Sequence, residues 1–224
     1  MPHSTFHRMR IFSLLLLLAA PLGAQATPDA TIVRDQHTFD SLMVDVRSLD
    51  HTIRVEDRYF GANNFTGAPL PGYDADRAFL RKEAATALAR VQHNLRRQHL
   101  GLLIYDAYRP VRATEAMVAW AERVGRKVEL VDGGYIASHS RHNLGTTVDL
   151  TLVDLRTHQP LEMGTPFDTF SEDAHTATAT GVAAENRRKL VDAMTAEGFQ
   201  NYDQEWWHFT MHLPEEPRFD VPVR

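Results

Sequence analysis

The stretch that organises this chain is residues 138–150, which read Ser-His-Ser-Arg-His-Asn-Leu-Gly-Thr-Thr-Val-Asp-Leu. His142 and Asp149 stand seven positions apart, on either side of a turn expected at Gly145. An imidazole and a carboxylate are ligand types that catalytic zinc accepts. Two such residues are more ordinarily a hydrogen-bonded or solvated His and Asp pair. A zinc site would therefore need a third ligand from elsewhere in the chain.

The β-branched run after the turn predicts a strand over 146–153. Side chains alternate along a strand, so two faces can be assigned. One face carries Val148, Leu150 and Leu152, and the other carries Thr147, Asp149 and Thr151. Positions seven apart on a straight strand would face opposite ways, so the turn is what allows the two candidate ligands to converge.

The complement to this stretch is the tetrapeptide Glu205-Trp206-Trp207-His208. A catalytic zinc commonly has three protein ligands, and His142, Asp149 and His208 supply such a set, although His139 and His212 compete as ligands. Glu205 is the candidate general base. If 206–213 is a strand, Glu205 must reach the site from the turn before it, because its parity is opposite to that of His208.

Three other features have both a functional and a structural interpretation. Arg109, fixed at a strand end by a following proline, could stabilise an oxyanion or form a surface ion pair. Asp168 could hold a substrate ammonium group or cap a turn. The tryptophans at 206 and 207 are expected to pack in the core.

The chain has 224 residues, a length that suits one domain. Its start has the pattern of a secretory signal peptide over residues 1–26: Arg8 and Arg10, an apolar run, and an Ala24-Gln25-Ala26 cleavage site. The apolar run is shorter than the roughly 20 residues of a membrane span. We therefore expect an exported, periplasmic protein whose mature domain is 27–224 and which has no membrane span after cleavage.

The charge and the cysteine content argue against nucleic-acid binding and limit the residue types that can bind a metal. The formal net charge is −5, and removal of the two arginines of the signal segment would leave −7. An acidic chain is a poor ligand for nucleic acid. With no cysteine in the sequence, there is no disulfide, and a metal must be bound by His, Asp and Glu. The oligomeric state is left open.

The periodicity of the sequence predicts an α+β single domain with a small antiparallel sheet flanked by helices. The predicted helices cover 76–99, 112–124 and 182–197. The predicted strands are 102–105, 146–153 and 206–213. Loops are expected at 59–73 and 154–181, and residues 27–58 can be assigned only as short strand or loop pieces.

Two motifs resemble a known family. Ser140-x-His142-x-x-Gly145-x-Thr147-x-Asp149 resembles the S-x-H-x-x-G-x-A-x-D signature of the M15 zinc peptidases, and the 205–208 tetrapeptide resembles their E-x-W-H element. The loop 64–73, the turn 108–110 and the segment 163–168 narrow the resemblance to the D-alanyl-D-alanine dipeptidases of that family. Thr147 departs from the usual alanine, and the stretch between Trp120 and Tyr135 is shorter than the family leads us to expect.

The resemblance implies a role for each site residue. It implies one zinc ion per chain on His142, Asp149 and His208, with Glu205 as catalytic base and Arg109 stabilising the transition state. It also implies that Asp168, with Tyr59 and Ser140, binds the free dipeptide.

The expected function is hydrolysis of D-alanyl-D-alanine, in cell-wall dipeptide turnover or glycopeptide resistance. The alternatives are a peptidoglycan D,D- or L,D-carboxypeptidase of the same superfamily and a non-catalytic zinc-binding or wall-binding module. A non-catalytic module has no need for Glu205 and Arg109 together.

Overall fold

The computed structural model describes Met1, residues 32–214 and residues 217–224. The predicted signal peptide and its cleavage site lie outside the described residues, apart from Met1. Within the described part of the chain, no helix is both long and apolar enough to cross a membrane.

The centre of the fold is a five-stranded sheet with the strand order β3-β5-β6-β8-β7. The strands are β3 (Arg54–Val55), β5 (Leu100–Asp106), β6 (Thr147–Asp154), β8 (His208–Thr210) and β7 (Gln200–Asn201). All neighbours pair antiparallel except β3 and β5, which are parallel. The prediction of a small antiparallel sheet in an α+β domain is thus confirmed, with one parallel edge added.

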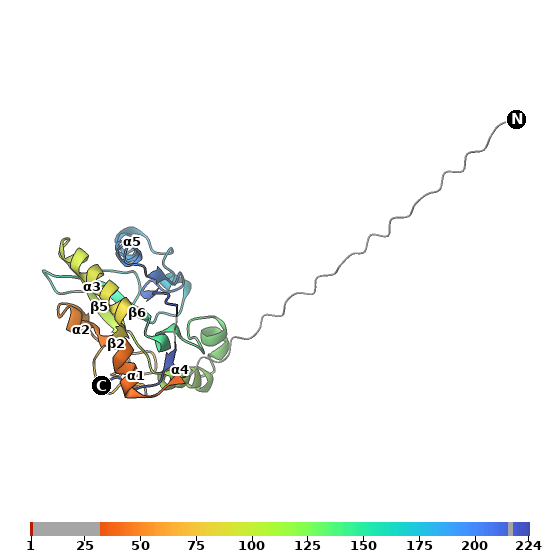
Figure 1. Cartoon of the computed structure of the whole chain (residues 1–224). Helices are drawn as coiled ribbons and strands as arrows, with labels where there is room; N and C mark the ends of the chain where they lie inside the picture. The colour runs from red at the N-terminus through yellow and green to blue at the C-terminus, as the bar shows by residue number, and fades with distance from the viewer. Residues whose placement is uncertain (2–31, 215–216) are drawn as a thin grey trace.

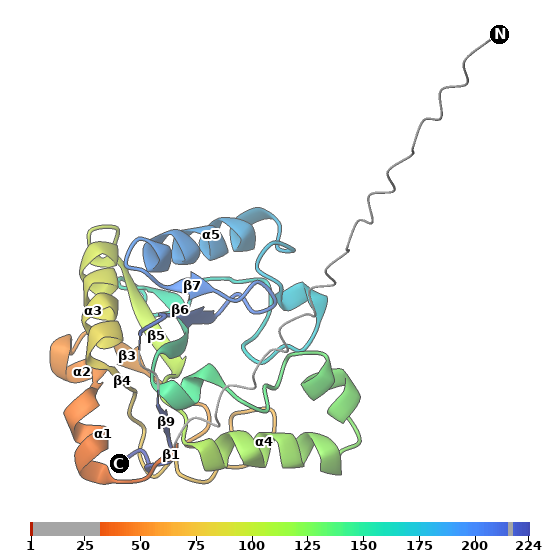
Figure 2. The same cartoon turned by 45° about the vertical axis from the view of Figure 1, so that its right-hand side comes forward.

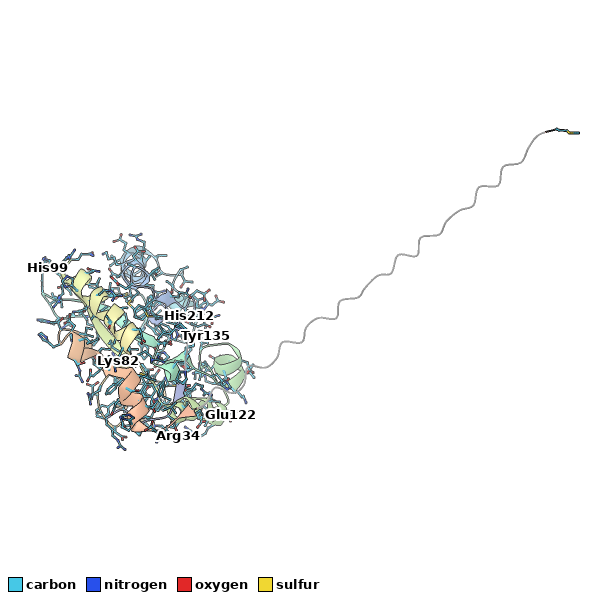
Figure 3. All side chains as sticks on the ribbon, viewed as in Figure 1. Arg34, Lys82, His99, Glu122, Tyr135 and His212 are labelled. Carbon is cyan, nitrogen blue, oxygen red and sulfur yellow. The ribbon has the colours of Figure 1, made fainter. Side chains whose placement is uncertain are left out.

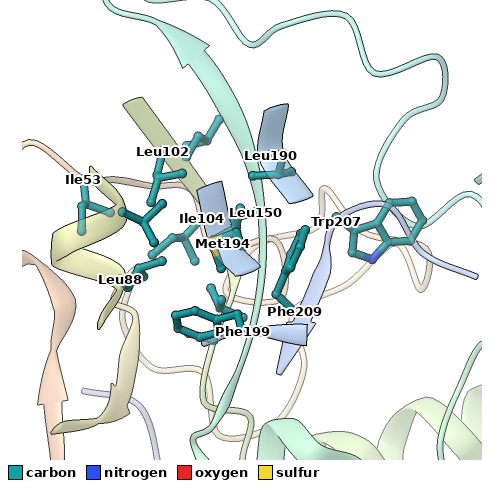
Figure 4. Close-up of a cluster of buried hydrophobic side chains, with 14 of the residues drawn as sticks. Ile53, Leu88, Leu102, Ile104, Leu150, Leu190, Met194, Phe199, Trp207 and Phe209 are labelled. Carbon is teal, nitrogen blue, oxygen red and sulfur yellow. The ribbon is translucent and has the colours of Figure 1, made fainter. Parts of the chain in front are cut away.

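Two long helices cover one face of this sheet. They are α3 (Lys82–Arg96) and α5 (Gly181–Thr195), seen beside β5 and β6 in Figures 1 and 2. Their apolar side chains meet those of the sheet in one buried cluster. Figure 4 shows this cluster, with Leu88 of α3 and Leu190 and Met194 of α5 packed near Leu102, Ile104, Leu150 and Phe209 of the strands. Leu150 therefore faces the helices, as strand parity predicted.

A second cluster forms around α4 (Val111–Arg123) and the short π-helix Val128–Asp132. The short helices α1 (Gln36–Leu42) and α2 (Val46–Leu49) lie in the segment that the sequence left unassigned. Each begins at a capping aspartate, because Asp35 accepts hydrogen bonds from backbone N–H groups of α1 and Asp45 accepts one from α2. Two small sheets complete the fold: β1 (Ile32–Val33) with β9 (Arg218–Phe219), and β2 (Met43–Asp45) with β4 (Phe79–Arg81).

The predicted helix 76–99 is too long at both ends. Residues 79–81 of that span form β4, which pairs with β2, and Asp76 accepts a hydrogen bond from the Asp57 N–H (2.9 Å). At the other end His99 adopts a left-handed conformation (φ 57°) at the tip seen in Figure 3. A glycine commonly ends a helix, but Gly101 lies inside β5, where a Cβ would come within 2.8 Å of the Leu155 side chain.

The predicted strand 206–213 is also too long, because Trp206 and Trp207 lie in a turn before β8. The backbone of Trp206 donates to the Ala174 carbonyl (3.1 Å), which draws it away from the sheet. Both tryptophan side chains are buried, as expected. The apolar spacing within 112–124 would place Val124 on the inner face, but it lies at the C-terminal cap of α4 and is 44% exposed.

Candidate active site

Three acidic or imidazole side chains come from one row across the sheet. Asp106 of β5 is opposite Asp149 of β6, and Asp149 is opposite His208 of β8. The register between β5 and β6 shifts between Ile104 and Asp106. This bulge is why Asp106 joins the face of Asp149, because an unbroken ladder would have placed it with Ile104 on the core face.

His142 reaches the same place from the short 3-10 helix Arg141–Leu144. Ser140 caps this helix by accepting a hydrogen bond from the His142 N–H (3.2 Å). Gly145 ends it in the left-handed region (φ 69°), where a side chain is strained, and a Cβ there would also meet the flexible end of the Met43 side chain. A tight turn at this position therefore requires glycine, and it delivers His142 beside Asp149.

The three predicted ligands form a compact cluster. Nε2 of His142 lies 3.3 Å from Oδ2 of Asp149 and 3.4 Å from Nδ1 of His208, and that Nδ1 lies 3.0 Å from Oδ1 of Asp149. Zinc bonds of ~2.0–2.1 Å at a tetrahedral centre hold ligand atoms about 3.3 Å apart. Oδ1 of Asp149 is buried and its only near neighbour among the described nitrogens is the ligand atom Nδ1 of His208, so both atoms can serve one cation. The donor set and its spacing fit zinc.

The environment prepares these ligands for a metal. Nδ1 of His142 lies 2.7 Å from the Ala107 carbonyl, which fixes the ring so that Nε2 faces the cluster. Burial lowers the pKa of His208 and favours the neutral imidazole that binds metal. Burial opposes the charge of Asp149, but the adjacent imidazoles of His142 and His208 lower its pKa below the usual range.

Glu205 stands beside the cluster, with Oε2 3.5 Å from Nδ1 of His208. It precedes β8 in a turn whose backbone bonds run from the Glu205 N–H to the Tyr202 carbonyl (3.0 Å) and from the His208 N–H to the Glu205 carbonyl (3.2 Å). The sequence prediction that it enters from a turn is confirmed. Burial, and then the negative charges of Asp149 and Asp168, raise the pKa of Glu205 well above its usual range.

Arg109 is buried on the other side of the cluster and is held by Asp106. Its Nε and Nη2 donate to Oδ2 of Asp106 at 3.0 and 2.8 Å, and Nη2 lies 4.0 Å from Oδ2 of Asp149. Burial opposes its charge, but the Asp106 carboxylate keeps the pKa of Arg109 high. The surface ion pair considered from the sequence is therefore wrong: the arginine is a fixed cation beside the candidate metal site.

Asp106 is the functional residue that sequence reasoning missed. It also accepts hydrogen bonds from the Tyr73 hydroxyl (2.7 Å) and the Ala107 N–H (2.9 Å), and it lies 3.3 Å from Nδ1 of His142. A carboxylate three residues before Arg109, at the end of a buried strand, is the signal that could have identified it.

Asp168 lies across the pocket from the cluster, in the long segment between β6 and α5. Its two carboxylate oxygens each accept from the Tyr59 hydroxyl at 3.2 Å. The Tyr59 ring also lies under the Arg109 guanidinium, 5.1 Å from ring centroid to Cζ. Burial, and then the charge of Asp149, raise the pKa of Asp168 well above its usual range.

All eight predicted site residues line one cavity of about 230 Å³, shared between the two hydrophobic clusters. They are Tyr59, Arg109, Ser140, His142, Asp149, Asp168, Glu205 and His208. The competing ligands are not in the cluster: His139 is exposed at the cavity wall, and the exposed His212 lies 3.0 Å from an Arg141 nitrogen (Figure 3). The volume is below the roughly 300–1,000 Å³ of drug-sized ligand sites, which favours a small ligand.

An α+β domain with a His/Asp/His cluster, an adjacent buried glutamate and a fixed arginine defines a metallopeptidase. The family model described as D-ala-D-ala dipeptidase matches residues 40–221, and the chain belongs to this M15 peptidase family.

Curated relatives agree with this assignment. A D-alanyl-D-alanine dipeptidase of Enterococcus faecium is 35% identical over 78% of this chain and 94% of its own length. The enzyme of the same description from Enterococcus faecalis is 38% identical over 76% of this chain and 91% of its own. The one from Escherichia coli K12 is 37% identical over 80% and 88%.

Solved structures are more distant. The vancomycin-resistance D,D-dipeptidase VanXYg, determined with a D-Ala-D-Ala phosphinate analogue, is 17% identical at a TM-score of 0.40, covering 76% of this chain and 66% of that one. A likeness at this level is no basis for assigning residues or function.

Proposed function

We propose that this protein is a zinc-dependent dipeptidase that hydrolyses free D-alanyl-D-alanine to D-alanine. The observation that carries the proposal is that a three-ligand metal cluster and the half-buried carboxylate of Asp168 line the same small cavity. The names of the curated relatives support the same substrate.

His142, Asp149 and His208 would hold one zinc ion. Zinc in such a site polarises the scissile carbonyl and lowers the pKa of water toward ~7. The ligands are pre-positioned by the sheet register and by the Ala107 carbonyl, so little rearrangement is needed on binding.

Glu205 is proposed to move the protons. It takes one from the attacking water as the water oxygen bonds to the carbonyl carbon, and it delivers one to the leaving nitrogen as the C–N bond breaks. Its carboxylate lies 3.5 Å from Nδ1 of the ligand His208, so it stands beside the metal site. Arg109, held by Asp106, donates to the carbonyl oxygen as negative charge develops there.

Asp168 is proposed to select the free dipeptide by pairing with its ammonium group. Tyr59 holds the carboxylate in place, and Ser140 offers a hydroxyl at the same cavity wall. A longer peptide has an amide nitrogen where the dipeptide has an ammonium, so when bound it would cover the half-buried Asp168 without compensating its charge. This argument disfavours the carboxypeptidase alternative.

We further propose that the protein acts after export to the periplasm, in wall dipeptide turnover or glycopeptide resistance. The basis is the signal-peptide pattern of residues 1–26. Fractionation of cells that express the full chain with a C-terminal tag checks it: a cytoplasmic, unprocessed product would refute export.

The test of function is a substrate panel. Zinc-loaded protein would be offered D-Ala-D-Ala, L-Ala-L-Ala, N-acetyl-D-Ala-D-Ala and a pentapeptide ending in D-Ala-D-Ala. We expect turnover of the free D,D-dipeptide and little of the acetylated or longer substrates. Preference for the pentapeptide would establish the carboxypeptidase alternative, and zinc binding without turnover of any substrate would establish the non-catalytic one.

A further inference from the structure

Arg187 of α5 is a buried cation that the proposed chemistry does not use. Its side chain is 1% exposed, yet no carboxylate forms an ion pair with it among the residues that the structure describes. Instead its guanidinium donates to three backbone carbonyls: Nε to Met163 (2.7 Å), Nη1 to His175 (2.6 Å) and Nη2 to Asp173 (3.0 Å). All three acceptors belong to the segment that carries Asp168.

The three carbonyls lie on both sides of Asp168 in the sequence. Met163 precedes it, and Asp173 and His175 follow it, so one side chain joins the two ends of the segment 163–175. This segment has little regular structure, only the 3-10 turn Glu172–Ala174. The rigid fork of a guanidinium can hold several carbonyls at fixed relative positions, which the single ammonium of lysine cannot do.

A second set of contacts connects the same segment to the turn that carries Glu205. The Arg187 guanidinium lies 5.9 Å from the Trp206 ring. Trp206 in turn donates through Nε1 to the Thr165 hydroxyl (2.9 Å) and through its backbone to the Ala174 carbonyl (3.1 Å). Gly164 fits closely against Arg187, since a Cβ there would lie 3.2 Å from Nη2.

The position of Asp168 depends on this support. Asp168 has a left-handed backbone conformation (φ 59°), which surrounding contacts must maintain in a residue other than glycine. The Tyr59 hydroxyl holds its carboxylate, while Arg187 holds the backbone on either side.

We propose that Arg187 is a positioning residue that holds Asp168 at the cavity and thereby sets the affinity for the ammonium group of the substrate. The inference rests on the proposed function and deepens it. Asp168 is proposed to contact the ammonium group equally in the bound substrate and in the transition state. Misplacing it should therefore weaken the binding of both by the same amount, which raises KM and leaves kcat unchanged.

The test is Arg187→Lys in the full zinc-loaded enzyme, with Arg188→Lys as the matched control on the exposed side of α5. We expect KM for D-Ala-D-Ala to rise about tenfold in Arg187→Lys, with kcat within about twofold of wild type. Zinc content should be unchanged, and Arg188→Lys should match wild type. A fall in kcat at constant KM, or no change in either, overturns the proposal.

A double-mutant cycle shows whether Arg187 acts through Asp168. In an Asp168→Asn background, Arg187→Lys should have almost no further effect on KM, whereas additive effects overturn the assignment. Hydrogen exchange of the 163–175 amides should quicken in Arg187→Lys and not in Arg188→Lys; unchanged exchange also overturns it.

Two further outcomes are decisive. If Arg187→Lys does not fold, Arg187→Gln, which keeps an amide donor, replaces it; failure of both to fold makes Arg187 a core residue and overturns the proposal. A wild type that does not hydrolyse D-Ala-D-Ala overturns the proposed function itself, whereas an active wild type with an unaltered KM in the variant overturns the Arg187 assignment alone.

Discussion

Replacing Asp106 with asparagine is the most informative perturbation of the site. The carboxylate is fully buried and accepts two hydrogen bonds from Arg109 at 3.0 and 2.8 Å, one from the Tyr73 hydroxyl at 2.7 Å and one from the Ala107 N–H at 2.9 Å. Asp106→Asn keeps the shape and one oxygen acceptor but removes the nearest countercharge of the buried guanidinium, leaving Asp149 at 4.0 Å.

The expected magnitude follows from these contacts. Breaking a buried ion pair by removing one charge costs about 3–5 kcal/mol. A domain of this size is stable by about 5–15 kcal/mol, so the variant should fold but unfold at a lower urea concentration. Complete loss of an oxyanion donor lowers kcat by about 10²–10³. Because asparagine retains one acceptor, we expect kcat/KM to fall between about tenfold and a hundredfold.

The assay is kcat/KM for D-Ala-D-Ala at fixed zinc occupancy, corrected for the folded fraction from urea unfolding. Asp220→Asn is the control, because Asp220 pairs with Arg112 at the same distance (2.8 Å) away from the cavity, although the Arg112 side chain is more exposed than that of Arg109. It should lower stability without changing kcat/KM. An Asp106→Asn enzyme with wild-type kcat/KM per folded, zinc-loaded molecule would refute the view that Asp106 orients Arg109.

Three further predictions concern the base, the core and pH. Glu205→Ala should retain zinc by elemental analysis but lose about 10²–10⁴ in kcat, whereas His142→Ala should lose the metal; normal turnover in Glu205→Ala would end its assignment as base. Leu88→Ala should cost about 2–5 kcal/mol in urea unfolding, since Leu88 is fully buried in the cluster with α5, and kcat should not change. For Asp220, burial opposes the charge but hydrogen bonds from Arg112 lower its pKa below the usual value. Its contribution is therefore complete above the unfolded pKa of ~3.9 and is lost as pH falls through the lower folded pKa. The stability difference between wild type and Asp220→Asn should be full at pH 6 and should begin to shrink only as the pH falls below about 4.

Local patterns in the sequence were sufficient for much of the fold. Side-chain periodicity located β6 and the two helices α4 and α5 to within about two residues, because helix and strand repeats are properties of the backbone over a few positions. The same alternation of side chains along a strand placed Asp149 on the face of β6 opposite to Leu150. The ends of α3 and β8 were wrong because pairing with β2 and the bond from Trp206 to Ala174 are made with distant parts of the chain.

By itself, the sequence determined the kinds of ligand available, the glycine turn before β6 and the family signature of both motifs. The tertiary structure alone decided that His142 and His208, 66 positions apart, meet at Asp149 while His139 and His212 do not. It also decided that a bulge in β5 turns Asp106 toward Arg109, and that Arg187 supports the segment carrying Asp168. The physical reason is that register and long-range hydrogen bonds depend on which strands and loops pack together, and no short window of sequence contains both partners.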